Sequence, residues 1–178
     1  MIICAGEIES FKFAEPMGIG LVDMAINLTR RCLLNKPEFI LFIGTAGSYG
    51  NHNILDIVES KRAANVELSF LENNSYTPLD NVLESENKFV KNDTIINSSN
   101  YITTNSQLAK KYNEYGIGCE NMEYFSVVKV AKEFEIPVAG IFAITNYTNK
   151  TAHEDFKKNH QEAMAKITKY LLDKNIIK

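Results

Sequence analysis

The amino-acid sequence predicts an α/β fold with three layers, in which helices flank a central mixed sheet, and a single domain that spans residues 1–178. Two observations support this prediction. Apolar residues recur at helical spacing in three segments, and continuous apolar runs typical of strands buried on both faces lie between those segments. Helix and strand therefore alternate along the chain, with no internal repeat and no linker.

The first half of the chain is predicted to form strand, helix and strand in turn. Residues 2–5, IICA, are a short apolar run and are expected to be the first strand. A helix follows over residues 20–35 and ends before Pro37, because proline disfavours helical backbone in the residue that precedes it. Its apolar positions fall at i, i+4, i+7 and i+11: Leu21, Ala25, Leu28 and Cys32. FILFIG, residues 39–44, and ILDIVE, residues 54–59, are the next strands.

The second half is predicted to contain a polar segment, then helix, strand and helix. Residues 65–105 are rich in Asn, Ser and Glu, and we expect short strands and long loops there without a second core. A helix is predicted at 122–135 and a buried strand, VAGIFAIT, at 138–145. The last helix is predicted at 153–174. The preceding TAHE predicts a capping box in which Thr151 and Glu154 bind the exposed amide groups.

Composition and charge exclude several classes of function. The net charge is −3 with 45% hydrophobic residues, and the pI is near 5.7, so no basic surface that would bind nucleic acid is expected. No apolar run approaches the roughly 20 residues that span a membrane, and the first residues carry no positive stretch typical of a secretion signal. Cys4, Cys32 and Cys119 are widely spaced and predict reduced, buried thiols, with no disulfide or metal site. We therefore expect a cytoplasmic protein with a small-molecule ligand.

LFIGTAGSYG, residues 41–50, places a glycine-rich turn at the end of a predicted strand. Ligands of open α/β sheets bind beyond the carboxyl ends of the strands, and small residues let backbone N–H groups approach an anion or a sugar. A phosphate site, a ribose site and a simple reversal of the chain at Gly44 and Gly47 all fit this turn. A dinucleotide site fits less well, because the G-x-G-x-x-G spacing is absent. The lysine of a P-loop is absent too.

Five stretches in order resemble the purine and uridine nucleoside phosphorylase superfamily, which includes the methylthioadenosine/S-adenosylhomocysteine nucleosidases and futalosine hydrolase. IICAGEIE is similar to the opening strand and acidic turn of the nucleosidases, GIGLVDMA to G-I-G-x-V-x-A-A, FIGTAGS to T-G-x-A-G, and LDIVES to G-D-I-V. NMEYFSVVKVAKEFEIPVAGIFAITN resembles the Met-Glu stretch that leads to the last strand and its S-D or T-N end. The resemblance covers most of the chain and implies a nucleoside phosphorylase-like fold.

The resemblance also implies a reaction, cleavage of the bond between ribose C1′ and a base nitrogen of a purine nucleoside, through an oxocarbenium-like transition state. Glu123, which follows Met122, corresponds to the carboxylate that accepts hydrogen bonds from the ribose 2′ and 3′ hydroxyls. Asn146 stands where nucleosidases have an aspartate that protonates the purine, and where low-mass phosphorylases have an asparagine. An amide donates a hydrogen bond but no proton, which implies a 6-oxopurine.

Four further residues complete the implied site. Tyr101 matches the aromatic residue that stacks near the base, and Glu9 matches the acid that positions the attacking water. Thr45 and Gly47 are expected on the nucleophile side of the ribose, with the Thr45 hydroxyl as a donor. The resemblance implies no cofactor, with inorganic phosphate as co-substrate if the reaction is phosphorolysis. Family members are homo-oligomers whose neighbours complete the site, so a homo-oligomer is expected.

The chain departs from the family pattern at two cationic positions. Phe42 stands where high-mass phosphorylases carry an arginine that holds phosphate, and Phe142 where nucleosidases carry an arginine near the water. Lys12, Lys61 and Arg62 are candidate replacements. The segment between IESFKF and GIG is also shorter than in the family by tens of residues.

Three hypotheses follow for the function. Because Phe42 replaces the phosphate arginine and Glu9 is retained, hydrolysis is expected over phosphorolysis. The missing arginines also fit a nucleoside-binding or scaffold protein of the same fold that has lost turnover. A flavodoxin-like or dinucleotide-binding module is the third, and it rests on fold class alone.

Overall fold

A nine-stranded mixed sheet forms the centre of the structure, a computed structural model that describes residues 1–178. Its central pair, β3 (Ile40–Ser48) and β9 (Val138–Tyr147), runs parallel over its whole length. The other strands are β1 (Ile2–Cys4), β2 (Glu15–Pro16), β4 (Ile57–Ser60), β5 (Arg62–Ala64), β6 (Val82–Glu84), β7 (Ile96–Ser98) and β8 (Cys119–Asn121). β1 pairs parallel with β3, whereas β8 joins the end of β3 and β4 joins β9 in antiparallel orientation.

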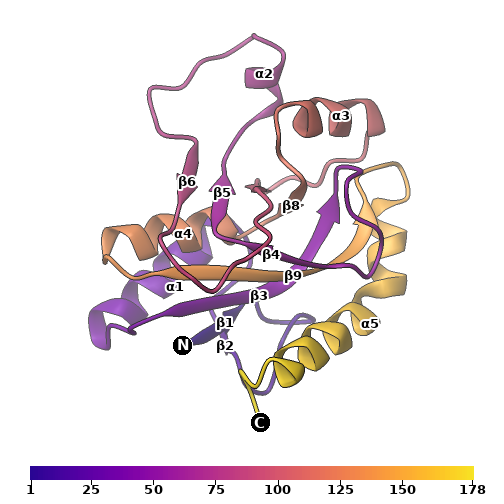
Figure 1. Cartoon of the computed structure of the whole chain (residues 1–178). Coiled ribbons are helices and arrows are strands. Elements are labelled where there is room, and N and C mark those ends of the chain that lie inside the picture. The colour runs from indigo at the N-terminus through magenta and orange to yellow at the C-terminus, as the bar shows by residue number, and fades with distance from the viewer.

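Helices cover both faces of the sheet (Figure 1). α1 (Gly20–Leu34) and α4 (Tyr124–Glu133) pack together on one face, and α5 (Ala152–Asp173) lies against β9 and β3 on the other. These helices confirm the three that the apolar spacing predicts. Two shorter helices, α2 (Leu68–Leu71) and α3 (Ser106–Glu114), lie at one end of the sheet. The predicted three-layer α/β architecture is therefore confirmed.

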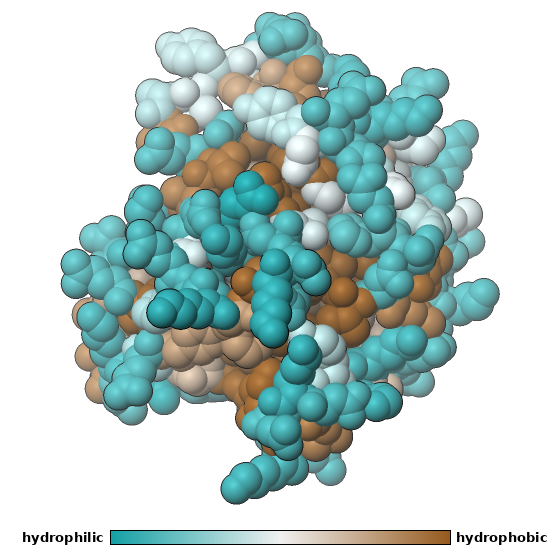
Figure 2. Space-filling model, in the orientation of Figure 1, coloured by the Kyte–Doolittle hydropathy of each residue, from teal (hydrophilic) through white to brown (hydrophobic).

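Alternate residues of the central strands face the two helical layers. Phe42 and Phe142 belong to a cluster of 22 buried residues on the side of α1 and α4, whereas Leu41, Ile43 and Ile141 belong to a cluster of ten on the side of α5. Both faces are covered, which explains why these strands are continuously apolar in the sequence. Over the face seen in Figure 2, hydrophilic residues cover most of the surface, and apolar residues show in separate groups between them.

Residues 65–105 form the short strands and loops that the sequence predicts, with one short helix, α2, that it does not, and they build no core of their own: Leu83 and Ile96 pack into the main cluster, and Val66 into a smaller one. A third cluster of six buried residues packs at this end of the sheet: Tyr49, Ala64, Val66, Ala109, Tyr112 and Ile117. Within it the rings of Tyr49 and Tyr112 stack with their centroids 4.6 Å apart. α3 supplies part of this cluster and was not predicted, because Ala109 and Tyr112 are its only buried residues and form too short an apolar stripe.

The capping box predicted for the last helix is also wrong. Thr151 makes no side-chain hydrogen bond to an amide of α5. Instead the backbone N–H and the hydroxyl of Thr151 lie 2.9 and 2.8 Å from the side-chain oxygen of Asn149, which accepts from them. Asparagine competes well for such local bonds, and it occupies the threonine that the box would need.

The three cysteines are free and buried, as expected. Burial raises the pKa of each thiol, which keeps it protonated and unreactive at neutral pH. No helix combines the length and the apolar character needed to cross a membrane.

Candidate active site

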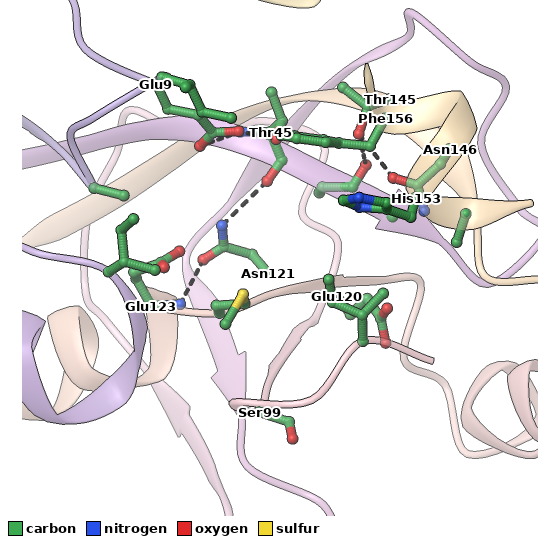
Figure 3. A pocket seen from close by; sticks show the side chains of 18 of the residues that line it. Glu9, Thr45, Ser99, Glu120, Asn121, Glu123, Thr145, Asn146, His153 and Phe156 are labelled. Carbon is green, nitrogen blue, oxygen red and sulfur yellow. Dashed lines mark hydrogen bonds between the residues drawn. The ribbon is translucent and has the colours of Figure 1, made fainter. Parts of the chain in front are cut away.

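A cavity of about 240 Å³ lies where β3 and β9 end together. Its walls come from the turn after β1, the ends of β3 and β9, β8, the loop before α3 and the first turn of α5. In Figure 3, Glu9, Thr45 and Glu123 lie along one side of the cavity, and Asn146, His153 and Glu120 lie along the other. The position beyond the carboxyl ends of parallel strands is the one that the sequence predicts for a ligand.

Glu123 is a buried carboxyl group, only 3% exposed, at the start of α4. Its Oε1 accepts a hydrogen bond of 2.8 Å from the backbone N–H of Gly20, the first residue of α1. Its Oε2 has no hydrogen-bond partner within the chain, and the residue lines the cavity. The pKa of Glu123 is raised to about 7, mainly by burial and to a smaller extent by the nearby Glu9, against the opposing effect of the Gly20 N–H.

Asn121 fixes the position of Glu123, and sequence reasoning did not identify it. Its side-chain oxygen accepts hydrogen bonds from the backbone N–H groups of Glu123 at 2.9 Å and Tyr124 at 3.0 Å. Its amide nitrogen donates to the carbonyl of Thr45 at 3.1 Å and so ties β8 to β3. The available signal was an asparagine three residues before the first residue of a helix, a region where this side chain commonly binds backbone amides.

Glu9 and Thr45 meet at the cavity. Glu9 lies at the end of a tight turn in which its N–H donates to the carbonyl of Gly6 at 3.0 Å, and Glu7 has a left-handed backbone with φ of 52°. The Thr45 hydroxyl donates to one oxygen of the Glu9 carboxylate, and the Thr45 N–H lies 3.5 Å from the other. Burial raises the pKa of Glu9, partly offset by these two donors.

Asn146 and Gly47 form the other end of the cavity. The pairing of β3 with β9 shifts by one residue here, so that Ala46 opposes Ile144 and Gly47 opposes Asn146. This bulge turns the Asn146 side chain, 6% exposed, towards the cavity. The Asn146 oxygen accepts from the Thr145 hydroxyl at 2.8 Å, which fixes the amide so that its nitrogen lies beside Gly47.

Met122 and Tyr101 also line the cavity, Met122 half-buried and Tyr101 85% exposed at the rim. The structure thus brings all seven residues named from the sequence to one cavity. Besides Asn121, the lining residues that the sequence did not identify as site residues include Glu120, His153 and Phe156. His153 and Phe156 lie on the first turns of α5, where a histidine or phenylalanine reads as an ordinary helix residue.

No lysine or arginine lines the cavity. Phe42 and Phe142 are fully buried and pack against each other with ring centroids 5.6 Å apart, on the side of α1 and α4. The suggested replacements are wrong, because none of them lines the cavity: Lys61 pairs with Glu84, Arg62 pairs with Asp93, and Lys12 is exposed elsewhere. The chain also gathers no three side chains of the types that would hold a metal ion.

The comparisons with known proteins agree with this geometry. A model of the phosphorylase superfamily matches residues 84–174. No curated protein sequence matches the chain. The fold is similar to that of a mutant nucleosidase from Helicobacter pylori with 5′-methylthioadenosine in its active site, at 19% identity and a TM-score of 0.76, covering 89% of this chain and 77% of that one.

Two other solved structures show the same fold. A futalosine hydrolase mutant of Helicobacter pylori is 19% identical with a TM-score of 0.76, over 88% of this chain and 76% of that one. A methylthioadenosine/S-adenosylhomocysteine nucleosidase of Streptococcus pneumoniae, in complex with 8-aminoadenine, is 16% identical with a TM-score of 0.78, over 96% of each chain.

The matched segment extends over just over half of the chain and includes both the Met-Glu pair and the last strand of the sheet. The resemblance in the sequence, the topology and the cavity beyond β3 and β9 all agree with this match. The chain therefore belongs to the phosphorylase superfamily.

Proposed function

We propose that the protein hydrolyses the N-glycosidic bond of a purine nucleoside. The observation that carries this proposal is the charge of the cavity, which is lined by Glu9, Glu120 and Glu123 and by no lysine or arginine. A phosphate ion would meet three carboxyl groups there and no lysine or arginine of this chain, whereas water and a nucleoside are neutral. Membership of the superfamily supports the reaction class, as does the shared fold with nucleosidases and a futalosine hydrolase.

Glu123 holds the ribose in the proposed complex. Its Oε1 is already occupied by the Gly20 N–H, and its Oε2 is free to accept hydrogen bonds from the 2′ and 3′ hydroxyls. Bonds to an ionised carboxylate contribute about 1.5–3 kcal/mol each. Met122, directly before Glu123, offers an apolar contact to the same sugar.

Glu9 positions the water that attacks C1′ and takes its proton. The Thr45 hydroxyl and N–H hold the Glu9 carboxylate in place, and its remaining lone pairs can accept from water. The raised pKa of Glu9 strengthens it as a base relative to an exposed glutamate. The reaction as proposed uses water and side chains of this chain, without a metal or cofactor.

Asn146 binds the base. Its oxygen is occupied by the Thr145 hydroxyl, so the amide offers an N–H to an acceptor atom of the purine. Tyr101, which is exposed at the rim, covers the base in the proposed complex. Tyr101 and Asn146 thus contact the base, and Glu123 and Met122 the sugar.

One observation favours a second candidate, a nucleoside-binding protein that has lost turnover. The two positions expected to hold arginines hold phenylalanines that are fully buried in the core, and no other arginine and no lysine lines the cavity. Such a protein would bind a nucleoside and release no base.

Turnover of a nucleoside panel separates these candidates. The protein is incubated with inosine, guanosine, adenosine and 5′-methylthioadenosine, with and without inorganic phosphate, and free base is measured. The proposal predicts base release that does not require phosphate and that Glu123→Gln abolishes. The exposed Glu114, with no interaction at the cavity, provides the matched control Glu114→Gln. Binding without base release supports the second candidate.

We also propose a homo-oligomer, in keeping with the family. Ile8, Ile19, Val22 and Ile26 are between 41% and 62% exposed, and they form an apolar surface on the turn after β1 and on α1, next to the cavity. Val22→Glu should convert an oligomer to a monomer in light scattering. The three reduced thiols fit a cytoplasmic location.

A further inference from the structure

Glu120 is a carboxyl group at the cavity to which the mechanism above gives no role. It pairs with Gly47 across β8 and β3, and Gly47 pairs with Asn146 across β3 and β9. A Cβ added to Gly47 would lie 3.3 Å from Glu120 Cγ and 3.0 Å from Asn146 Nδ2. Both side chains therefore extend over Gly47 on the same face of the sheet, on the side of the cavity away from Glu9 and Glu123 (Figure 3).

Cleavage of the glycosidic bond requires a proton at this end of the cavity. When the C1′–N9 bond breaks, its electron pair passes to the base, and a neutral leaving base needs a proton on a ring nitrogen. Asn146 donates a hydrogen bond but has no proton to give. We propose that Glu120 is the general acid that protonates the leaving base, an inference that rests on the proposed function.

The surroundings of Glu120 suit a carboxyl group that gives up a proton during the reaction. Burial raises its pKa, which favours the protonated form before the reaction. The Tyr49 hydroxyl lies 2.9 Å from one oxygen and the Thr103 N–H lies 3.0 Å from the other. Both groups donate to the carboxylate that remains after transfer and stabilise it.

The groups that influence Glu120 electrostatically are few. The titratable side chains near it are the phenols of Tyr49 and Tyr112 and the buried thiol of Cys119. His153 lies on the same side of the cavity as Glu120, at the edge farther from it (Figure 3). No lysine or arginine lines the cavity to keep Glu120 ionised.

The proton balance of the step closes with groups of this chain. The C1′–N9 bond breaks with its electrons moving to the base, and the Glu120 proton moves to a ring nitrogen of that base. Water forms the new bond to C1′ and passes its proton to the Glu9 carboxylate. The products are free ribose and neutral base, and exchange with solvent moves the proton from Glu9 back to Glu120.

Leaving groups of different basicity test this role. Wild type, Glu120→Gln and the surface control Glu114→Gln are compared on a purine nucleoside and on 4-nitrophenyl β-D-riboside, whose leaving group departs without a proton. Glu120→Gln should lower kcat on the nucleoside by about 10²–10⁴-fold and leave kcat on the nitrophenyl riboside within a fewfold of wild type. Glu114→Gln should match wild type on both.

A second variant gives a readout that a purely structural role would not move. Tyr49→Phe removes a donor that lowers the pKa of Glu120, so the alkaline limb of the kcat profile on the nucleoside should move to higher pH. It keeps the ring that stacks on Tyr112, so folding is preserved. If the alkaline limb of the kcat profile stays at the wild-type pH in Tyr49→Phe, the proposal is contradicted.

Other outcomes would overturn it in distinguishable ways. Equal loss on both substrates shows a structural role for Glu120. A change confined to the preference between 6-oxopurine and 6-aminopurine nucleosides shows a recognition role. If His153→Gln lowers kcat on the nucleoside but not on the nitrophenyl riboside, and Glu120→Gln does not, the general acid is the imidazole of His153. A wild-type protein that releases no base from any purine nucleoside overturns the hydrolysis itself, and the acid with it.

Discussion

Replacing Glu123 by glutamine should stabilise the fold while it removes the ribose site. Burial raises the pKa of Glu123 from 4.5 to about 7, so the folded chain binds this proton more tightly than the unfolded chain. Its favourable contribution is complete below pH 4.5 and is lost as the pH rises through about 7. A pKa that differs by one between the folded and unfolded chain corresponds to about 1.36 kcal/mol. The rise from 4.5 to about 7 therefore lowers the free energy of unfolding by about 3 kcal/mol at pH 8 relative to pH 4.5.

Glutamine is neutral at every pH and keeps an oxygen that accepts from the Gly20 N–H. Urea unfolding of Glu123→Gln should therefore show a gain of about 3 kcal/mol over wild type at pH 8 and little change at pH 4.5. The control Glu114→Gln, at an exposed position, should stay within about 0.5 kcal/mol of wild type at both values. The reasoning is refuted if the gain is the same at both pH values, or if the variant is less stable at pH 8.

Three further predictions concern the ends of β3 and β9 and the turn after β1. Gly47→Ala puts a Cβ 3.0 Å from Asn146 Nδ2 and should lower kcat on a nucleoside at least tenfold by displacing that amide; unchanged kinetics would show that the amide does not contact the base. Asn146→Asp adds a carboxyl that can carry a proton, so turnover of adenosine relative to inosine should rise, by tenfold for each 1.36 kcal/mol gained in the transition state. A constant ratio argues against a base-binding role for residue 146. Glu7→Gly relieves a left-handed φ of 52° and should stabilise the fold by up to about 1 kcal/mol in urea unfolding, and a loss of stability would contradict this.

The layers of the fold could be predicted because their signals are local. Leu28 and Cys32 on α1, and the unbroken apolar run of β9, report burial directly through spacing and composition. The lobe around α3 could not be predicted, because Tyr49 and Tyr112 stack across a separation of 63 residues and only the tertiary structure brings them together. The capping of α5 could not be predicted either, because Asn149 and Glu154 are both near Thr151 in the sequence, and Thr151 binds Asn149.

The residues of the candidate active site also divide into those that the sequence could predict and those that only the tertiary structure reveals. Glu123, Asn146 and Glu9 could be predicted because the stretches around them resemble those of the family. Glu120 carries no such signal, and Asn121 is marked only by its place before a helix. Their roles arise from the register of β8 against β3, which sets Glu120 opposite Gly47, and from a bond between Asn121 and the Thr45 carbonyl across 76 residues.

The origin of the oxygen placed on C1′ distinguishes hydrolysis from phosphorolysis. The protein is incubated with a purine nucleoside in ¹⁸O-labelled water that also contains unlabelled inorganic phosphate, and the sugar product is examined by mass spectrometry. Because the cavity holds three carboxyl groups and no lysine or arginine, the account predicts free ribose that carries one ¹⁸O atom from water. Ribose 1-phosphate with an unlabelled bridging oxygen would contradict it.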